Sequence, residues 1–162
     1  MRVIGIDPGT LHAGYGVVEE KGGGFRYVAS GVINAAGETV AARLAVIFRG
    51  LRAAIETYRP EAAAVETVFA GNNLKTAITI GEARGVALLA AAVDNLPVAG
   101  YEPTVVKRAV TGNGHATKEQ VQRLMQILLN LPQLPPSDHE ADALAMALTH
   151  LRRQTVARRL PR

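Results

Sequence analysis

An acidic residue at the end of an apolar strand is the feature that most constrains how this chain can fold. The apolar side chains of Val3–Ile6 predict a buried strand, and Pro8 and Gly9 end it directly after Asp7. A carboxylate at such an edge is costly to desolvate unless a cation or hydrogen-bond donors face it. We therefore expect the Asp7 side chain to face a polar site.

Glu66 repeats this arrangement further along the chain. It follows the small apolar run Ala62–Val65, and further acids come at Asp138, Glu140 and Asp142. Hard metal ions prefer oxygen ligands, and carboxylates from separate segments can hold such ions for phosphate chemistry. In a chain without cysteine, these acids predict a site for a hard metal ion.

The composition is that of one ordinary globular domain. Of the 162 residues, 48% are hydrophobic and 20% are charged, which argues against a disordered chain. The absence of cysteine excludes disulfides and thiolate zinc sites and fits a reducing compartment, so we expect a cytoplasmic protein. The chain begins directly with a strand, so we expect no signal peptide. Its longest apolar stretch, Gly85–Val93, is too short to span a bilayer.

The basic charge is concentrated at the C-terminus. The chain has a net charge of +4, but five arginines lie within its last eleven residues, and residues 1–151 carry 13 basic and 14 acidic groups. The high isoelectric point therefore describes the end of the chain rather than its body. We divide the chain into a folded domain, residues 1–153, and a basic tail, residues 154–162. The tail is either a solvated end or an arm that follows DNA.

The pattern of apolar and turn-forming residues predicts an α/β fold. We expect strands near residues 3–6, 13–19, 25–34, 62–67 and 97–102, and helices near residues 40–58, 75–95 and 104–111. Capping boxes that begin at Thr117 and Ser137 predict two further helices, the second ending near Arg153. This order of elements predicts a sheet with helices on both faces.

The helix expected over residues 75–95 is nearly apolar in its second half. It carries Ala77, Gly81 and Gly85 at four-residue spacing, and such small residues permit another helix to approach closely. Two interpretations remain open. The helix is buried between the sheet and a second subunit, or it is a central helix of the core.

Two residue pairs share a face of the last predicted helix. His139 and Asp142 are three residues apart, and Asp138 and Asp142 are four apart. Asp138 has a structural explanation, because an acid in the first turn interacts favourably with the helix dipole, and Glu140 completes a capping box. Asp142 lies beyond the first turn in an apolar run, so we expect it to be functional. His139 has weaker support, since a histidine at a helix start is often only a solvated polar residue.

Several motifs resemble those of the RuvC family of bacterial Holliday-junction resolvases. In chain order they are Gly5–Thr10, Gly14–Gly16, Glu66–Phe69, Gly81–Gly85, Val106–Gly112 and Ala141–Leu144, and the match runs over about residues 1–152. The resemblance implies an RNase H-like fold with a five-stranded mixed sheet, so that residues 1–153 form a nuclease domain. It also implies a homodimer that resolves four-way DNA junctions by paired symmetric nicks, through metal-dependent phosphodiester hydrolysis, in homologous recombination and DNA repair.

The resemblance implies a role for each candidate site residue. Asp7, Glu66 and Asp142 match the family's metal-binding acids, and His139 matches a catalytic residue three positions before the last acid. All four are therefore predicted to be catalytic residues and metal ligands. Asp138 is one position out of that register and is the alternative to His139. Clustered carboxylates repel one another unless protons or cations lie among them, which fits up to two Mg²⁺ ions per subunit, with Mn²⁺ as an alternative.

DNA-binding residues and partners follow from the same resemblance. Lys107 and Lys118 flank the Gly112–Gly114 turn and match lysines that the family uses near the phosphate backbone, although from sequence alone each would be a solvated surface lysine. Phe69 lies in a loop rich in glycine and asparagine and resembles the family's aromatic residue that stacks on bases at the junction centre. The branch-migration proteins RuvA and RuvB are the expected partners.

Other functions compete with the junction resolvase. Gly5–Thr10 also resembles the phosphate-binding opening of sugar kinases and actin-like ATPases, but those enzymes need two such domains and a second phosphate loop, which 162 residues do not supply. A nuclease of the same fold that cuts RNA–DNA hybrids and a catalytically inactive DNA-binding module remain open. Every site prediction requires the side chains of Asp7, Glu66 and Asp142 to meet in one solvent-accessible pocket.

Overall fold

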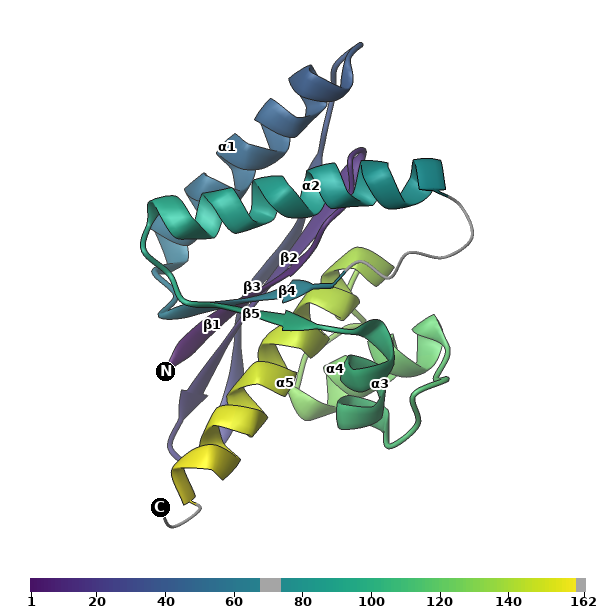
Figure 1. Cartoon of the computed structure of the whole chain (residues 1–162). Helices are drawn as coiled ribbons and strands as arrows, with labels where there is room; N and C mark the ends of the chain where they lie inside the picture. Colours follow the sequence, from purple (N-terminus) through teal and green to yellow (C-terminus); the bar gives the residue numbers. More distant parts are fainter. Residues whose placement is uncertain (68–73, 160–162) are drawn as a thin grey trace.

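One five-stranded mixed sheet lies at the centre of the molecule (Figure 1). The computed structural model describes residues 1–67 and 74–159. The strands are β1 (Arg2–Asp7), β2 (His12–Lys21), β3 (Gly24–Asn34), β4 (Ala62–Glu66) and β5 (Val98–Tyr101). Their order across the sheet is β3-β2-β1-β4-β5. Strand β2 pairs antiparallel with both β1 and β3, and β4 pairs parallel with both β1 and β5. The predicted five-stranded mixed sheet is confirmed.

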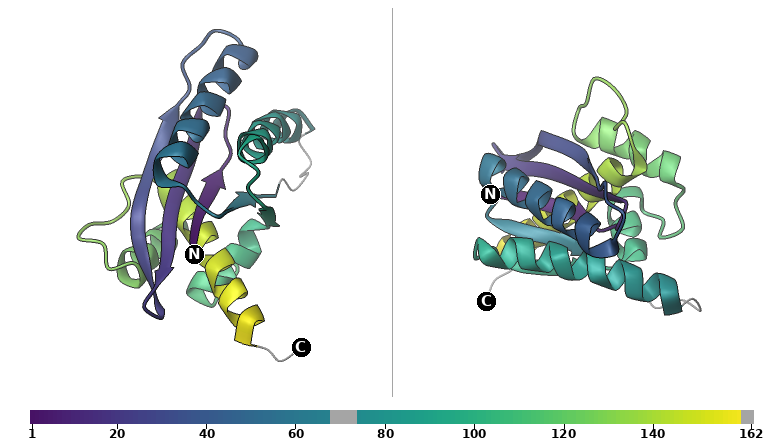
Figure 2. Two further views of the ribbon diagram at one scale, coloured as in Figure 1. Left: turned by 90° about the vertical axis from the view of Figure 1, so that its left-hand side faces the viewer. Right: turned by 90° about the horizontal axis from the view of Figure 1, so that it is seen from above.

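Helices cover both faces of this sheet (Figures 1 and 2). One face carries α1 (Val40–Tyr58) and α2 (Leu74–Val93), and the other carries α3 (Pro103–Thr111), α4 (Lys118–Leu128) and α5 (Asp138–Arg159). Each face therefore has its own hydrophobic core, with the sheet between the two. This arrangement confirms the α/β fold expected from the order of elements.

The alternation of side chains along the strands decides which residues face α5. Val3 belongs to the core under α5, whereas Ile4 and Ile6 belong to the core under α1 and α2. Successive side chains of a strand point to opposite faces, so Asp7 lies on the same face as Val3. In β4 the same alternation directs Glu66 toward the α5 face.

Close approach of α5 to the sheet requires glycine in β1 and β2. A Cβ atom built on Gly5 would lie 1.9 Å from the carbonyl oxygen of Ala143, and one on Gly14 would lie 2.3 Å from that of His139. Any larger residue would push the helix away from the strands. These two glycines thus hold the first turns of α5 directly over the ends of β1 and β2.

The two predicted capping boxes have different outcomes. At the start of α4, Gln120 N donates to Thr117 Oγ1 and Thr117 N donates to Gln120 Oε1, as predicted. At the start of α5, the backbone N–H of Glu140 donates to Ser137 Oγ at 3.2 Å. The Glu140 carboxylate, however, accepts hydrogen bonds from the hydroxyls of Ser30 at 2.6 Å and Ser137 at 3.4 Å. Glu140 therefore links the start of α5 to β3 rather than closing a reciprocal box.

The last helix continues beyond its expected end near Arg153. It runs to Arg159, and its final turns pack beside β2. Thr155 Oγ1 donates to Glu20 Oε1 at 2.9 Å, and Arg158 Nη1 donates to Glu20 Oε2 at 3.3 Å. These contacts with a strand acid explain why the helix persists into the basic segment. The division into a domain and a tail at residue 153 stays a prediction.

Helix α2 is long and apolar enough, by length and composition alone, to cross a membrane. A core helix of a globular protein passes the same test, and one face of α2 is buried through Ala83, Ala87 and Ala90. The opposite face exposes large apolar side chains, among them Ile78 and Leu89. The expectation of no membrane-spanning stretch was based on the uninterrupted apolar run at residues 85–93, which is only the second half of α2.

Candidate active site

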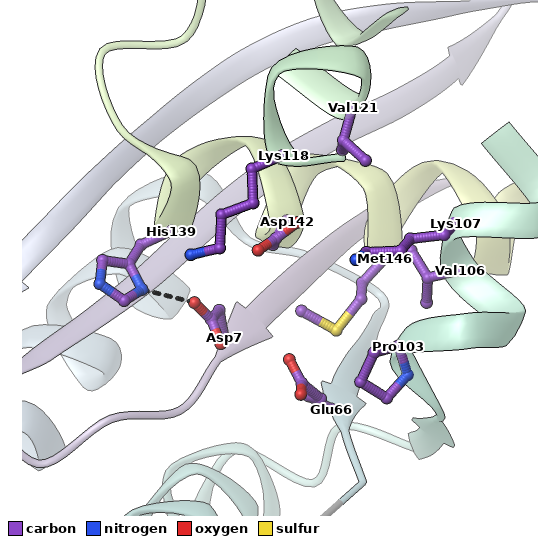
Figure 3. A pocket seen from close by; sticks show the side chains of 10 residues that line it. All are labelled: Asp7, Glu66, Pro103, Val106, Lys107, Lys118, Val121, His139, Asp142 and Met146. Atoms are coloured by element: carbon purple, nitrogen blue, oxygen red, sulfur yellow. Dashed lines mark hydrogen bonds and ion pairs between the residues drawn. The ribbon is translucent and has the colours of Figure 1, made fainter. Parts of the chain in front are cut away.

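Three acids from distant parts of the chain line one pocket (Figure 3). Strands β1 and β4 are parallel neighbours with Ile6 opposite Val65, so Asp7 and Glu66 end adjacent strands side by side. Asp142 reaches the same pocket from α5, one turn after the helix begins. The three side chains therefore converge as the sequence predicted.

The rest of the pocket combines cations with apolar side chains. The cavity has a volume of about 300 Å³, and its lining also includes His139, Lys107, Lys118, Pro103, Val106, Val121 and Met146. The apolar residues come mainly from α3 and α4 and lie on one side of the acids (Figure 3). Such a pocket strengthens electrostatic interactions among the groups inside it.

His139 is held against Asp7. Its Nδ1 atom lies 2.6 Å from Asp7 Oδ2, while the His139 side chain stays 39% exposed and that of Asp7 is 15% exposed. With Asp7 ionised, Nδ1–H donates this hydrogen bond, and Nε2 is left for another partner. The contact fixes the orientation of the imidazole ring beside the acids.

Burial and mutual repulsion raise the pKa values of two of the acids. Burial, with the neighbouring charges of Asp7 and Asp142, raises the pKa of Glu66 from 4.5 to about 8. Burial and the charge of Asp7 raise the pKa of Asp142 from 3.8 to about 6. Lys107 opposes both shifts without cancelling them. Both acids therefore hold a proton more tightly than a free carboxyl group does.

This donor set fits a hard divalent cation. Carboxylate oxygens are the ligands that Mg²⁺ prefers, and an added cation would relieve the repulsion that, together with burial, raises the pKa values of Glu66 and Asp142. Within residues 1–67 and 74–159, no three acidic or histidine side chains already form a group that could hold one metal ion. Asp7, Glu66 and Asp142 would be the residues that hold such an ion in this pocket.

The two predicted DNA-binding lysines, Lys107 and Lys118, line the same pocket as the acids. Of the two α5 residues that could act beside Asp142, His139 lines the pocket and Asp138 is not among its lining residues. Instead, Asp138 Oδ2 lies 3.0 Å from Lys118 Nζ. Phe69, the predicted base-stacking residue, lies outside the described residues.

Two residues near the site were missed by sequence reasoning. Arg84 Nε donates to the backbone oxygen of Glu66 at 3.1 Å and so supports the end of β4. The His12 ring centre lies 6.0 Å from that of His139, and His12 Nδ1 lies 2.9 Å from Asn34 Oδ1. Arg84 belongs to a motif that carried the family resemblance, and this was the available signal. His12 had no such signal, because only the pairing of β2 with β1 and the position of α5 bring it near His139.

Comparison with known proteins identifies one family. A family model described as crossover junction endodeoxyribonuclease RuvC matches residues 3–150. A protein of that name from Moorella thermoacetica is 52% identical over 151 residues, which cover 93% of this chain and 90% of the relative. Another from Hahella chejuensis is 49% identical over 154 residues, covering 95% and 89%.

A solved structure of the same family has the same fold. Thermus thermophilus RuvC in complex with Holliday junction substrate superimposes with a TM-score of 0.89 at 38% identity, covering 97% of this chain and 96% of the other. This likeness extends over both faces of the sheet and confirms the predicted RNase H-like fold.

Proposed function

The chain belongs to the RuvC family of crossover junction endodeoxyribonucleases, and on this premise we propose that it resolves four-way DNA junctions at the pocket between β1, β4 and α5. It is a structure-selective endonuclease of homologous recombination and DNA repair. The observation that carries this proposal is the convergence of Asp7, Glu66 and Asp142 in one pocket. An ATPase of the sugar-kinase or actin-like class is disfavoured, since the family assignment covers nearly the whole chain.

The reaction is the hydrolysis of one phosphodiester bond in each of two opposed strands. A water oxygen attacks the phosphorus, the bond to the 3′ oxygen breaks, and that oxygen takes up a proton. The products are a 5′-phosphate and a 3′-hydroxyl, which can be ligated. Asp7, Glu66 and Asp142 would hold up to two Mg²⁺ ions, or Mn²⁺ in their place. The chemistry that these ions supply when bound is the activation of water and the stabilisation of the leaving oxygen.

His139 acts as a catalytic residue in this proposal. The hydrogen bond between its Nδ1 and Asp7 orients the ring and leaves Nε2 to hold or transfer a proton at the scissile phosphate. His139 is also the candidate for a further metal ligand. Its contact with Asp7 favours it over Asp138, whose carboxylate pairs with Lys118.

Contacts to the DNA backbone come from the side of the pocket formed by α3 and α4. Lys107 and Lys118 present their ammonium groups beside the acids, where each can neutralise a phosphate of the bound strand. Phe69 is proposed to stack on bases at the junction centre, in line with the family resemblance.

A homodimer would match the near two-fold symmetry of a four-way junction. Helix α2 exposes a row of large apolar side chains, namely Leu74, Ile78, Leu89 and Val93. A Cβ atom built on Gly81 or Gly85 meets no described atom within 4 Å, so a second helix has room to approach. We assign this face to the subunit contact, which would give a dimer two sites for opposed strands. A cytoplasmic location and the partners RuvA and RuvB are proposed from family membership.

A cleavage assay tests the function directly. We expect purified protein with Mg²⁺ to cut a four-way junction with paired nicks at symmetric positions. Linear duplex and RNA–DNA hybrid should remain intact, and EDTA should abolish cutting. Preferential cutting of the hybrid would instead indicate a ribonuclease of the same fold. Binding of the junction without cutting, under every divalent metal tried, would indicate an inactive DNA-binding module.

A further inference from the structure

An ion pair joins the first residues of two helices at the rim of the active-site pocket. Lys118 is the first residue of α4 and Asp138 is the first residue of α5. The Lys118 Nζ atom lies 3.0 Å from Asp138 Oδ2. The ammonium group points into the space between His139, Asp142 and Asp7 (Figure 3).

The position of Lys118 is electrostatically unusual for a lysine. A cation at a helix N-terminus is unfavourable, because the helix dipole places partial positive charge there. Nearby acids compensate for this. The hydrogen bond to Asp138 raises the pKa of Lys118, and the charges of Asp142 and Asp7 add to the effect. Asp138 itself is stabilised by the N-terminus of α5, so it needs no lysine to be stable where it lies.

We propose that Asp138 pairs with Lys118 in place of a DNA phosphate. In the free protein, Asp138 holds Lys118 toward the pocket, and when the junction binds, Lys118 leaves Asp138 and pairs with a phosphate. Asp138 is then a positioning residue that lowers DNA affinity without contacting DNA, rather than a metal ligand. The inference rests on the proposed function, since it requires Lys118 to contact the backbone of the bound strand.

The exposure of the pair makes such an exchange possible. The Lys118 side chain is 58% exposed and that of Asp138 is 40% exposed, so a phosphate can reach the ammonium group. An exposed ion pair shifts an equilibrium only by about 1.5- to 5-fold. A lysine that neutralises a phosphate also releases counterions from DNA, which adds a favourable term that Asp138 does not offer.

Binding measurements with a double-mutant cycle test this inference. Junction affinity is measured in EDTA, so that no strand is cut, over a range of salt concentrations. The variants are Asp138→Asn, Lys118→Ala and the double variant. Glu56→Gln is the matched control, because it removes one exposed acid from α1 on the opposite face of the sheet.

The expected result is a gain in affinity that depends on Lys118. Asp138→Asn should tighten binding about 1.5- to 5-fold more than Glu56→Gln does. Lys118→Ala should weaken binding and reduce the slope of log affinity against log salt by about 1. When Lys118 is already alanine, Asp138→Asn should have no more effect than Glu56→Gln.

Each other outcome overturns the inference, and the reason can be identified. An equal gain from Asp138→Asn with and without Lys118, or no gain beyond the control, would show that Asp138 does not restrain Lys118. Unchanged affinity together with lost cleavage would identify Asp138 as a metal ligand. If Lys118→Ala leaves both affinity and salt slope unchanged, the assignment of Lys118 to the DNA backbone fails as well. Junction cutting by the wild-type protein is a separate measurement, so the proposed nuclease function can stand in all of these cases.

Discussion

The Nδ1 atom of His139 lies 2.6 Å from Oδ2 of Asp7, a contact between residues 132 positions apart in the chain. It joins the end of β1 to the first turn of α5. Glu66 and Asp142 line the same pocket. One strand end, its parallel neighbour and one helix start therefore supply the four proposed catalytic side chains.

Neutralising any one of the three acids should remove cleavage while leaving junction binding largely intact. In Asp7→Asn, Glu66→Gln or Asp142→Asn, the pocket loses a carboxylate that would hold the metal ion. We expect the single-turnover rate to fall by at least about 100-fold, the scale of removing one transition-state stabiliser. Glu56→Gln on α1 is the control and should cut normally. Full activity in any of the three acid variants would contradict the assignment.

His139→Ala should slow cleavage at saturating junction by about 100-fold or more, because a positioned proton donor or acceptor is lost. His139→Asp should retain more activity than alanine, since a carboxylate can also bind a cation or accept a proton. The measurement is the single-turnover rate with junction affinity recorded in parallel. Wild-type cutting by His139→Ala would exclude a catalytic role.

Without metal, the folded protein should lose stability as pH rises. The pKa of Glu66 is raised from 4.5 to about 8, so the folded state binds a proton more tightly than the unfolded state does. The stabilisation is fully present below pH 4.5 and is lost as pH rises through about 8.

This pH effect can be isolated by comparing wild type with Glu66→Gln in urea unfolding at several pH values in EDTA. The free energy of unfolding of wild type should fall relative to the variant by about 1–3 kcal/mol between pH 5 and pH 8. Mg²⁺ should restore wild-type stability at pH 8, because it binds the ionised acids of the folded state. A constant difference across this range would contradict the raised pKa.

Gly5→Ala should destabilise the protein and displace α5. A Cβ on Gly5 would lie 1.9 Å from the Ala143 carbonyl oxygen, so either the strand or the helix must move. Overpacking of this kind costs about 1–3 kcal/mol, measurable as a lower midpoint of thermal unfolding. Gly24→Ala is the matched control, since a Cβ there meets no described atom within 4 Å. Equal midpoints for the two variants would argue against the close approach.

A charge on the apolar face of α2 should weaken the proposed dimer. Ile78→Asp or Leu89→Asp would place a carboxylate in a contact that otherwise buries apolar surface, and sedimentation should then show monomers at micromolar concentration. Ile127→Asp on α4, a helix on the other face of the sheet, is the control, because Ile127 is 69% exposed. Dimers that persist in both α2 variants would place the subunit contact elsewhere.

Local pattern was sufficient to predict much of the fold. The apolar runs before Asp7 and Glu66 predicted two strands, and the Thr117–Gln120 capping box predicted the start of α4. These features depend on interactions between residues close in sequence, so a short window contains the needed information. The length of α5 was underestimated, because its last turns are supported by Glu20 on β2, a partner distant in sequence.

By itself, the sequence determined the kinds of side chain available and the faces on which they could lie: acids at strand ends, and His139 and Asp142 on one side of a helix. Only the tertiary structure decided which of the neighbours Asp138 and His139 turns toward Asp7. Successive helical residues point in different directions. The close contacts at the strand glycines place α5 on the sheet so that His139 contacts Asp7 and Asp138 contacts Lys118. Such pairings depend on strand register and helix orientation together, which no local pattern specifies.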